Sequence, residues 1–151
     1  MHTVKPTIVI LSISYPEITG ILKHKTGKEV SLTYKSEDTI TAAYSASVEI
    51  PVLRKTISKD FSVDLKILEI KDNQLVVRID AGSAGNIAIR AAKSFLLPRI
   101  PGLIDSGATD RRTFLFDLVK IEQLKPVLEQ MDMNTLNICP DEIMIEATIK
   151  A

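Results

Sequence analysis

One short string in the chain contains residue types that could perform acid–base chemistry. It reads Leu103-Ile104-Asp105-Ser106-Gly107-Ala108-Thr109, an aspartate between two apolar residues and a hydroxyl–glycine pair. A positioned carboxylate can transfer protons, and two carboxylates that lie close together share one proton because both cannot ionise. The serine and glycine allow a tight turn that would present the carboxylate. Asp105 is therefore the candidate catalytic residue.

This string resembles the active-site loop of retroviral-type aspartic proteases, in which two apolar residues precede Asp-Ser-Gly-Ala or Asp-Thr-Gly-Ala. The resemblance implies a homodimer in which each copy supplies one aspartate, with Asp105 as the catalytic base. It is confined to this string, which follows Pro101-Gly102 about two thirds of the way along the chain. Asp, Ser and Gly are also the usual residues of polar surface loops, and that is the interpretation we favour.

The histidines and the single cysteine indicate no further catalytic site. His24 lies in a basic run with Lys23, Lys25 and Lys28, which we interpret as a solvated hairpin tip, with an anion or partner contact as the alternative. Cys139 ends an apolar stretch and is expected to be a small core residue. One cysteine and two histidines are too few for a Cys/His zinc site within one chain, so we expect no metal and no other cofactor.

Two further polar groups of residues have a structural interpretation. Gly82-Ser83-Ala84-Gly85 lacks the lysine of a phosphate-binding loop and the glycine spacing of a dinucleotide fingerprint. We interpret it as a strand-to-helix turn in which Ser83 caps the helix. A basic cluster opposite Asp105 and Asp110 is interpreted as a solvated face; it comprises Arg90, Lys93, Arg99, Arg111 and Arg112.

Composition narrows the class of protein. The 151 residues predict a single domain over 1–151, and 45% apolar with 25% charged residues is typical of a globular protein. The 19 basic residues balance the 19 acidic ones, which argues against a nucleic-acid partner. The apolar stretch at 8–13 is too short to span a bilayer and lacks a signal-peptide pattern. We expect a cytoplasmic protein, with a mature form that has lost its leader as the alternative.

Alternation of apolar and polar residues predicts strands in the first half of the chain. The clearest run is 38–50, which places Ile40, Ala42, Tyr44 and Ala46 on one face. Further strands are expected over 8–15, 29–35, 61–67 and 74–80, and the segment after Pro16 is interpreted as a loop. A change of phase at 67–68 indicates a bulge, and Asp72-Asn73 indicates a tight turn.

The second half predicts helices between strands. Apolar residues at helical spacing over 84–96 indicate an amphipathic helix with an alanine-rich seam, ended by Pro98. The segment 98–112 is interpreted as a loop. A short helix is expected at Pro126, with Val127, Leu128 and Met131 as its apolar stripe. Strands are expected over 113–119, 135–139 and 143–149.

This order of elements predicts an α+β fold, with a long-stranded, curved antiparallel sheet packed on one main amphipathic helix plus a short second helix. It is faintly similar to tubular lipid-binding domains, in which a curved sheet wraps a helix. Apolar faces without a catalytic constellation favour a non-catalytic module that binds an apolar small molecule, a lipid or a protein partner. The alternatives are an aspartic-protease-like homodimer that uses Asp105 and a structural subunit that assembles through strand edges as a homo-oligomer.

Overall fold

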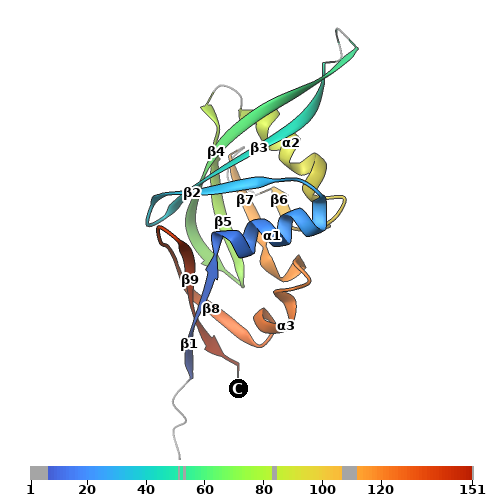
Figure 1. Ribbon diagram of the computed structural model, residues 1–151. Helices are drawn as coiled ribbons and strands as arrows, with labels where there is room; N and C mark the ends of the chain where they lie inside the picture. The colour runs from blue at the N-terminus through green and yellow to red at the C-terminus, as the bar shows by residue number, and fades with distance from the viewer. Residues whose placement is uncertain (1–6, 51, 53, 83–84, 107–111, 151) are drawn as a thin grey trace, which may run out of the picture.

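The computed structural model describes residues 7–50, 52, 54–82, 85–106 and 112–150 of the chain, and it has an α+β fold with two antiparallel sheets (Figure 1). The larger sheet has the order β2 (Val30–Ser36), β3 (Thr39–Ile50), β4 (Lys55–Lys71), β5 (Gln74–Asp80), β7 (Thr113–Asp117) and β6 (Ile104–Ser106). The smaller sheet has the order β1 (Ile8–Ser14), β9 (Glu142–Ile149) and β8 (Met131–Ile138).

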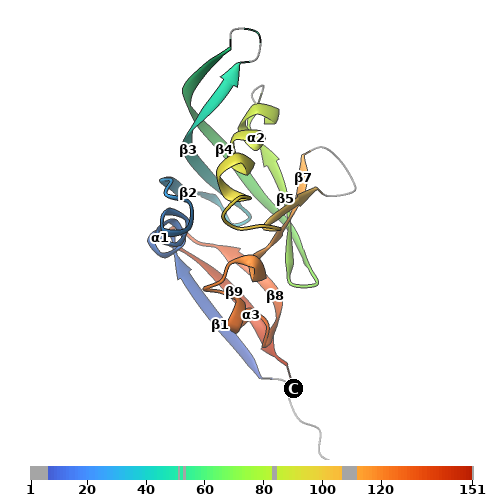
Figure 2. The same ribbon diagram turned by 90° about the vertical axis from the view of Figure 1, so that its right-hand side faces the viewer.

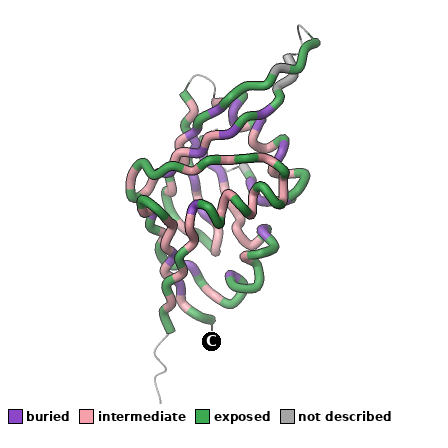
Figure 3. Tube along the Cα trace, in the orientation of Figure 1, coloured by how far each residue is buried: buried purple, intermediate pink, exposed green. Residues whose placement is uncertain are grey.

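The helices connect and cover these sheets. They are α1 (Tyr15–Thr26), α2 (Gly85–Leu96), the short α3 (Lys125–Leu128) and a 3-10 turn, η2 (Leu118–Lys120). Figure 2 shows α2 lying against one face of the six-stranded sheet, with the three-stranded sheet at the opposite end of the molecule from the β3–β4 hairpin. Figure 3 shows the buried positions gathered where the two sheets and the helices meet.

The face predicted for the strand at 38–50 is confirmed. Ile40, Ala42, Tyr44 and Ala46 are all buried, and the strand that carries them pairs with β4 from Thr39 to Ile50. Because side chains alternate along a strand, these four residues form one continuous apolar surface. The bulge is confirmed as well, since the register of β4 with β5 shifts between positions 67 and 69.

The segment from Tyr15 to Thr26 is a helix, so the sequence-based interpretation of a loop after Pro16 was wrong. Ser14 and Glu17 form a reciprocal cap: the Glu17 amide donates to Ser14 Oγ at 3.2 Å, and the Ser14 amide donates to Glu17 Oε1 at 3.2 Å. Such a cap satisfies N–H groups that a helix start otherwise leaves unpaired. Gly27 ends the helix with φ of 73°, a left-handed conformation that glycine adopts without strain.

Helix α2 is confirmed as the main helix on the large sheet. Its buried residues are Ala88, Ala91 and Phe95, so small side chains let the helix approach β3, β4 and β5 closely. Ile87, which the spacing placed on the same seam, is exposed. The expected cap, Ser83, lies outside the described residues.

The short helix α3 is confirmed, with Pro126 in its first turn, but its predicted apolar stripe is not. Leu128 is buried, whereas Val127 is exposed and Met131 already belongs to strand β8. The helix ends after Leu128, so a residue three positions later cannot lie on its surface. Pro140 and Asp141 lie in the connection between β8 and β9.

Candidate functional site

An apolar cavity of about 230 Å³ lies between the two sheets and the helices. Its wall combines the concave face of the large sheet, residues of α1 and α2, and the inner face of the small sheet. The strands contribute, among others, Leu32, Ile40, Ala42, Val63, Leu65, Leu75, Val77, Ile79 and Phe116 from the large sheet, with Ile13, Leu136, Ile143 and Ile145 from the small one. The helices contribute Ile18, Leu22, Ile89, Ala92, Phe95 and Leu96.

Local sequence explains why this wall is apolar. In β3, and in β4 from Phe61 to Ile67, every second residue is apolar. The pairing of Ala42 with Val63 keeps both on the same face of the sheet. In α1, Tyr15, Ile18 and Leu22 recur at helical spacing and turn toward the body of the protein. Strand and helix patterns therefore converge on one hydrocarbon-lined space.

Among the side chains in this wall, the Tyr44 hydroxyl is the polar group, and it already makes a hydrogen bond within the protein. Tyr44 Oη donates to the Ala88 carbonyl of α2 at 2.6 Å, and the ring lies edge-on to Phe95 with centroids 5.5 Å apart. Burial away from water raises the pKa of Tyr44 from 10.0 to about 12, because the ionised form is poorly solvated there. The cavity therefore offers no free hydrogen-bonding group from Tyr44.

Burial of the wall is uneven. The central strands supply its most buried residues, such as Ile40, Val63 and Val77. The residues from the helices are mostly half-buried, as at Leu22 and Ile89. The helix side is therefore where the cavity lies closest to solvent.

Tyr44 also gives a pH-dependence that tests its buried position. Between about pH 10 and 12 the unfolded chain loses the tyrosine proton while the folded chain keeps it, so stability falls as pH rises through this window. We expect the free energy of unfolding to fall by about 2 kcal/mol there on account of Tyr44. Denaturant titrations of wild type and Tyr44→Phe across this range measure the difference, and Tyr34→Phe, at an exposed tyrosine, is the control. Equal slopes in wild type and Tyr44→Phe would contradict the prediction.

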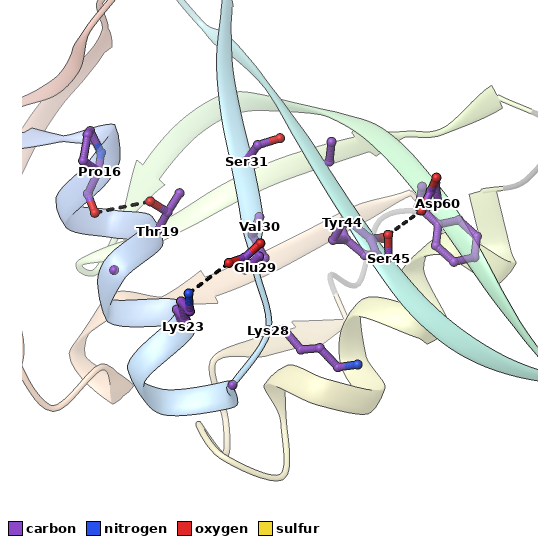
Figure 4. Close-up of a pocket in the computed structure, with 14 residues that line it drawn as sticks. Pro16, Thr19, Lys23, Lys28, Glu29, Val30, Ser31, Tyr44, Ser45 and Asp60 are labelled. Atoms are coloured by element: carbon purple, nitrogen blue, oxygen red, sulfur yellow. Dashed lines mark hydrogen bonds and ion pairs between the residues drawn. The ribbon is translucent and has the colours of Figure 1, made fainter.

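A second hollow of about 870 Å³ is an open groove on the outside, between α1, the start of β2 and strands β3 and β4 (Figure 4). Its polar groups largely satisfy one another: Lys23 Nζ lies 2.9 Å from Glu29 Oε1, and Ser45 donates to Asp60. The hydrogen bond from Lys23 lowers the pKa of Glu29. Exposed pairs of this kind contribute little energy and leave few groups for a ligand, so the apolar cavity is the stronger candidate site.

Asp105 lies on the other side of the large sheet from the cavity. Its backbone pairs with Leu115 in the short edge strand β6, so the interpretation of 98–112 as a loop was wrong at Ile104–Ser106. Asp105 itself is exposed. The neighbours Ile104 and Phe116 point the opposite way, into the cavity wall. Residues 107–109, the rest of the protease-like string, lie outside the described residues. The catalytic role of Asp105 stays a prediction: Asp105→Asn should abolish any peptide cleavage at mildly acidic pH without unfolding the protein.

His24 lies in the last turn of α1 and is exposed, so the prediction of a hairpin tip was wrong. Basic residues at a helix C-terminus interact favourably with its carbonyl groups. Lys25 from the same turn donates a hydrogen bond through Nζ to Glu122 Oε2 at 2.6 Å. This hydrogen bond lowers the pKa of Glu122. At least part of the basic run thus joins α1 to the segment after η2.

Cys139 was expected to be a core residue, but it is half-buried in the connection between β8 and β9. The Tyr15 hydroxyl donates to its carbonyl, which ties the start of α1 to the small sheet. Of the predicted basic cluster, Lys93 lies with its Nζ 4.9 Å from the centroid of the Phe114 ring. Arg111 of the cluster, and Asp110 opposite it, lie outside the described residues. The described part of the chain holds no group of three or more His, Cys, Asp or Glu that could bind a metal ion.

Sequence reasoning named no ligand-binding residue, although it identified most of the strand faces that form the wall. Only α1 left an overlooked local signal, the Ser14-Tyr-Pro-Glu17 cap followed by apolar residues at helical spacing. No protein-family model, curated protein or solved structure matches the chain at a significant level. Among the described residues, no helix has the length and apolar character needed to cross a membrane.

Proposed function

We propose that this protein is a non-catalytic module that binds a small apolar molecule, or the hydrocarbon segment of a lipid, in the cavity between its sheets. The observation that carries the proposal is a space of about 230 Å³ walled by hydrocarbon, with its tyrosine hydroxyl bonded to a backbone carbonyl. A dry apolar cavity of about 150 Å³ is enough to bind benzene. The space therefore suits a ligand part somewhat larger than one benzene ring.

The energetic argument for an occupant is the cost of an empty space. At roughly 24 cal/mol per Å³, a void of this volume forgoes about 5 kcal/mol of stability. That is comparable with the whole net stability of many proteins, roughly 5 to 15 kcal/mol. A ligand that fills the space restores the missing dispersion contacts, so its binding is expected to stabilise the folded chain.

Mass spectrometry of the freshly purified protein tests for a bound ligand directly. We expect a mass excess under native conditions that disappears on denaturation, and a lipid or small apolar molecule in an organic extract of the same sample. A clean native mass, together with no binding of an added apolar fluorescent probe, would contradict the proposal and indicate a core without a ligand.

Two variants on one strand test whether such binding occurs in this cavity. Ala42 lies in the cavity wall, whereas its neighbour Ala43 faces the outer groove on the opposite side of the same strand. Ala42→Leu is expected to abolish probe binding while changing the free energy of unfolding by less than about 1 kcal/mol, because a void accepts the added carbons; overpacking a filled core costs about 1 to 3 kcal/mol. Ala43→Leu should bind the probe as wild type does. Unchanged binding by Ala42→Leu would place the ligand elsewhere.

A further inference from the structure

We infer that strand β1 is a dimerisation edge, which pairs antiparallel with β1 of a second copy and joins the two small sheets into one six-stranded sheet. The inference does not depend on the proposed ligand. It rests on the backbone groups of β1 that do not bond to β9 and on the self-complementary sequence of this strand. It also rests on the hydrogen bonds and charged residues found at the other sheet edges.

The pairing with β9 determines which groups of β1 face outward. The Ile149 amide donates to the Thr7 carbonyl at 2.9 Å, and Val9 pairs with Ala147 two residues further on. In an antiparallel ladder every second residue bonds to the same neighbour. Ile8, Ile10 and Ser12 therefore direct their N–H and C=O groups away from β9, to the open edge.

The opposite edge of this sheet, formed by β8, is bonded to the rest of the protein at both ends. Asn73, in the β4–β5 turn, donates through Nδ2 to the Met131 carbonyl and accepts from the Met133 amide through Oδ1, both at 2.8 Å. The Ile138 amide donates to the Glu37 carbonyl at 3.0 Å. Intramolecular hydrogen bonds thus occupy the free side of β8 near both of its ends. No such bond is found on the outer side of β1 within the described residues.

The remaining sheet edges carry features that discourage pairing with another chain. Strand β2 carries Lys35 and an irregularity between positions 34 and 36, and β6 has three residues. Charged residues also occur where the long hairpin extends beyond its neighbours: Lys55, Lys59 and Asp60. Strand β1 has no charged residue and no proline from Thr7 to Ser14, and Ile8 and Ile10 are 58% and 63% exposed.

A second copy of the same strand complements this edge. A two-fold axis at Ile10 pairs that residue with its counterpart and pairs Ile8 with Ser12 of the other copy. All three residues of each copy then both donate and accept across the interface, and the two Ile10 side chains contact each other as a cross-strand pair. No like charges meet along this edge, because β1 carries none.

Disulfide trapping tests both the pairing and its register. In a Cys139→Ser background, Ile10→Cys should give a covalent dimer on mild oxidation, since hydrogen-bonded antiparallel partners have Cα atoms about 5.5 Å apart, within disulfide range. Ser12→Cys is the matched control: in this register the Cα atoms of its two copies lie about 14 Å apart, too far to bridge. Trapping through position 12 in preference to position 10 would overturn the register.

Sedimentation of the untagged protein tests the dimer without added cysteines. Wild type is expected at twice the mass of the chain, and Ile10→Pro at the monomer mass with unchanged circular dichroism, because the lost N–H does not bond to β9. Ile10→Lys should also be monomeric, because it places two like charges opposite each other. This variant keeps the backbone N–H, so it tests the dimer even if proline perturbs the strand. A wild type that stays monomeric at high micromolar concentration, or dimers that persist in both variants, would overturn the proposal.

Discussion

Replacing Asn73 with alanine is expected to lower the free energy of unfolding by about 2 to 4 kcal/mol. Its side chain makes two hydrogen bonds of 2.8 Å to strand β8, one to the Met131 carbonyl and one from the Met133 amide. Met133 is buried, so its amide would be left without a partner. Asn73 also has φ of 61°, a left-handed conformation that disfavours alanine.

Two companion variants separate these contributions. Asn73→Gly removes both hydrogen bonds but tolerates the positive φ, so it should be more stable than Asn73→Ala by about 1 kcal/mol. Asn73→Asp keeps an acceptor for the Met133 amide and loses the donor to Met131. We expect urea titrations to rank wild type first, Asn73→Asp next and Asn73→Ala last. Equal stability of wild type and Asn73→Ala would show that the two hydrogen bonds from Asn73 to β8 do not contribute to stability.

Truncation of Ile100 to alanine is expected to cost about 2 to 5 kcal/mol, the usual range for a buried aliphatic residue. Ile100 is 2% exposed and belongs to the main core. Its amide donates to the Leu96 carbonyl at 2.8 Å and its carbonyl accepts from the Leu103 amide at 3.2 Å, so the chain after α2 turns tightly around it. The void left by the truncation cannot close easily, because both sides of this turn are held by hydrogen bonds.

The adjacent residue provides a matched control for Ile100. Arg99 is exposed, and Arg99→Ala should change stability by less than about 0.5 kcal/mol, since its backbone bond to Leu96 remains. Ile100→Val should fall between the two, at about 0.5 to 1.5 kcal/mol. Guanidinium unfolding of the three variants measures the series. A cost below about 1 kcal/mol for Ile100→Ala would contradict the burial of this turn.

Patterns within single segments were sufficient to predict most elements of the fold. The alternation in β3 correctly placed Ile40, Ala42 and Tyr44 on the buried face, because side-chain direction along a strand has a period of two. The turn at Asp72-Asn73 was also readable, since the two residues tolerate the positive φ of a tight hairpin. Helix α1 was missed because the β-branched residues before it indicate a strand and Pro16 indicates where that strand ends. Ser14 and Glu17 nevertheless carried the capping signal of a helix start.

By itself, then, the sequence determined the α+β class, the apolar faces and the local turns. Only the tertiary structure decided that these faces enclose a space, because a cavity is set by how side chains from two sheets and two helices meet. It also decided that Asn73 bonds to one edge of the small sheet, while Ile10 lies on the edge for which the described residues supply no partner strand. Pairing between distant segments has no periodic signal, since contact depends on where the whole chain has folded.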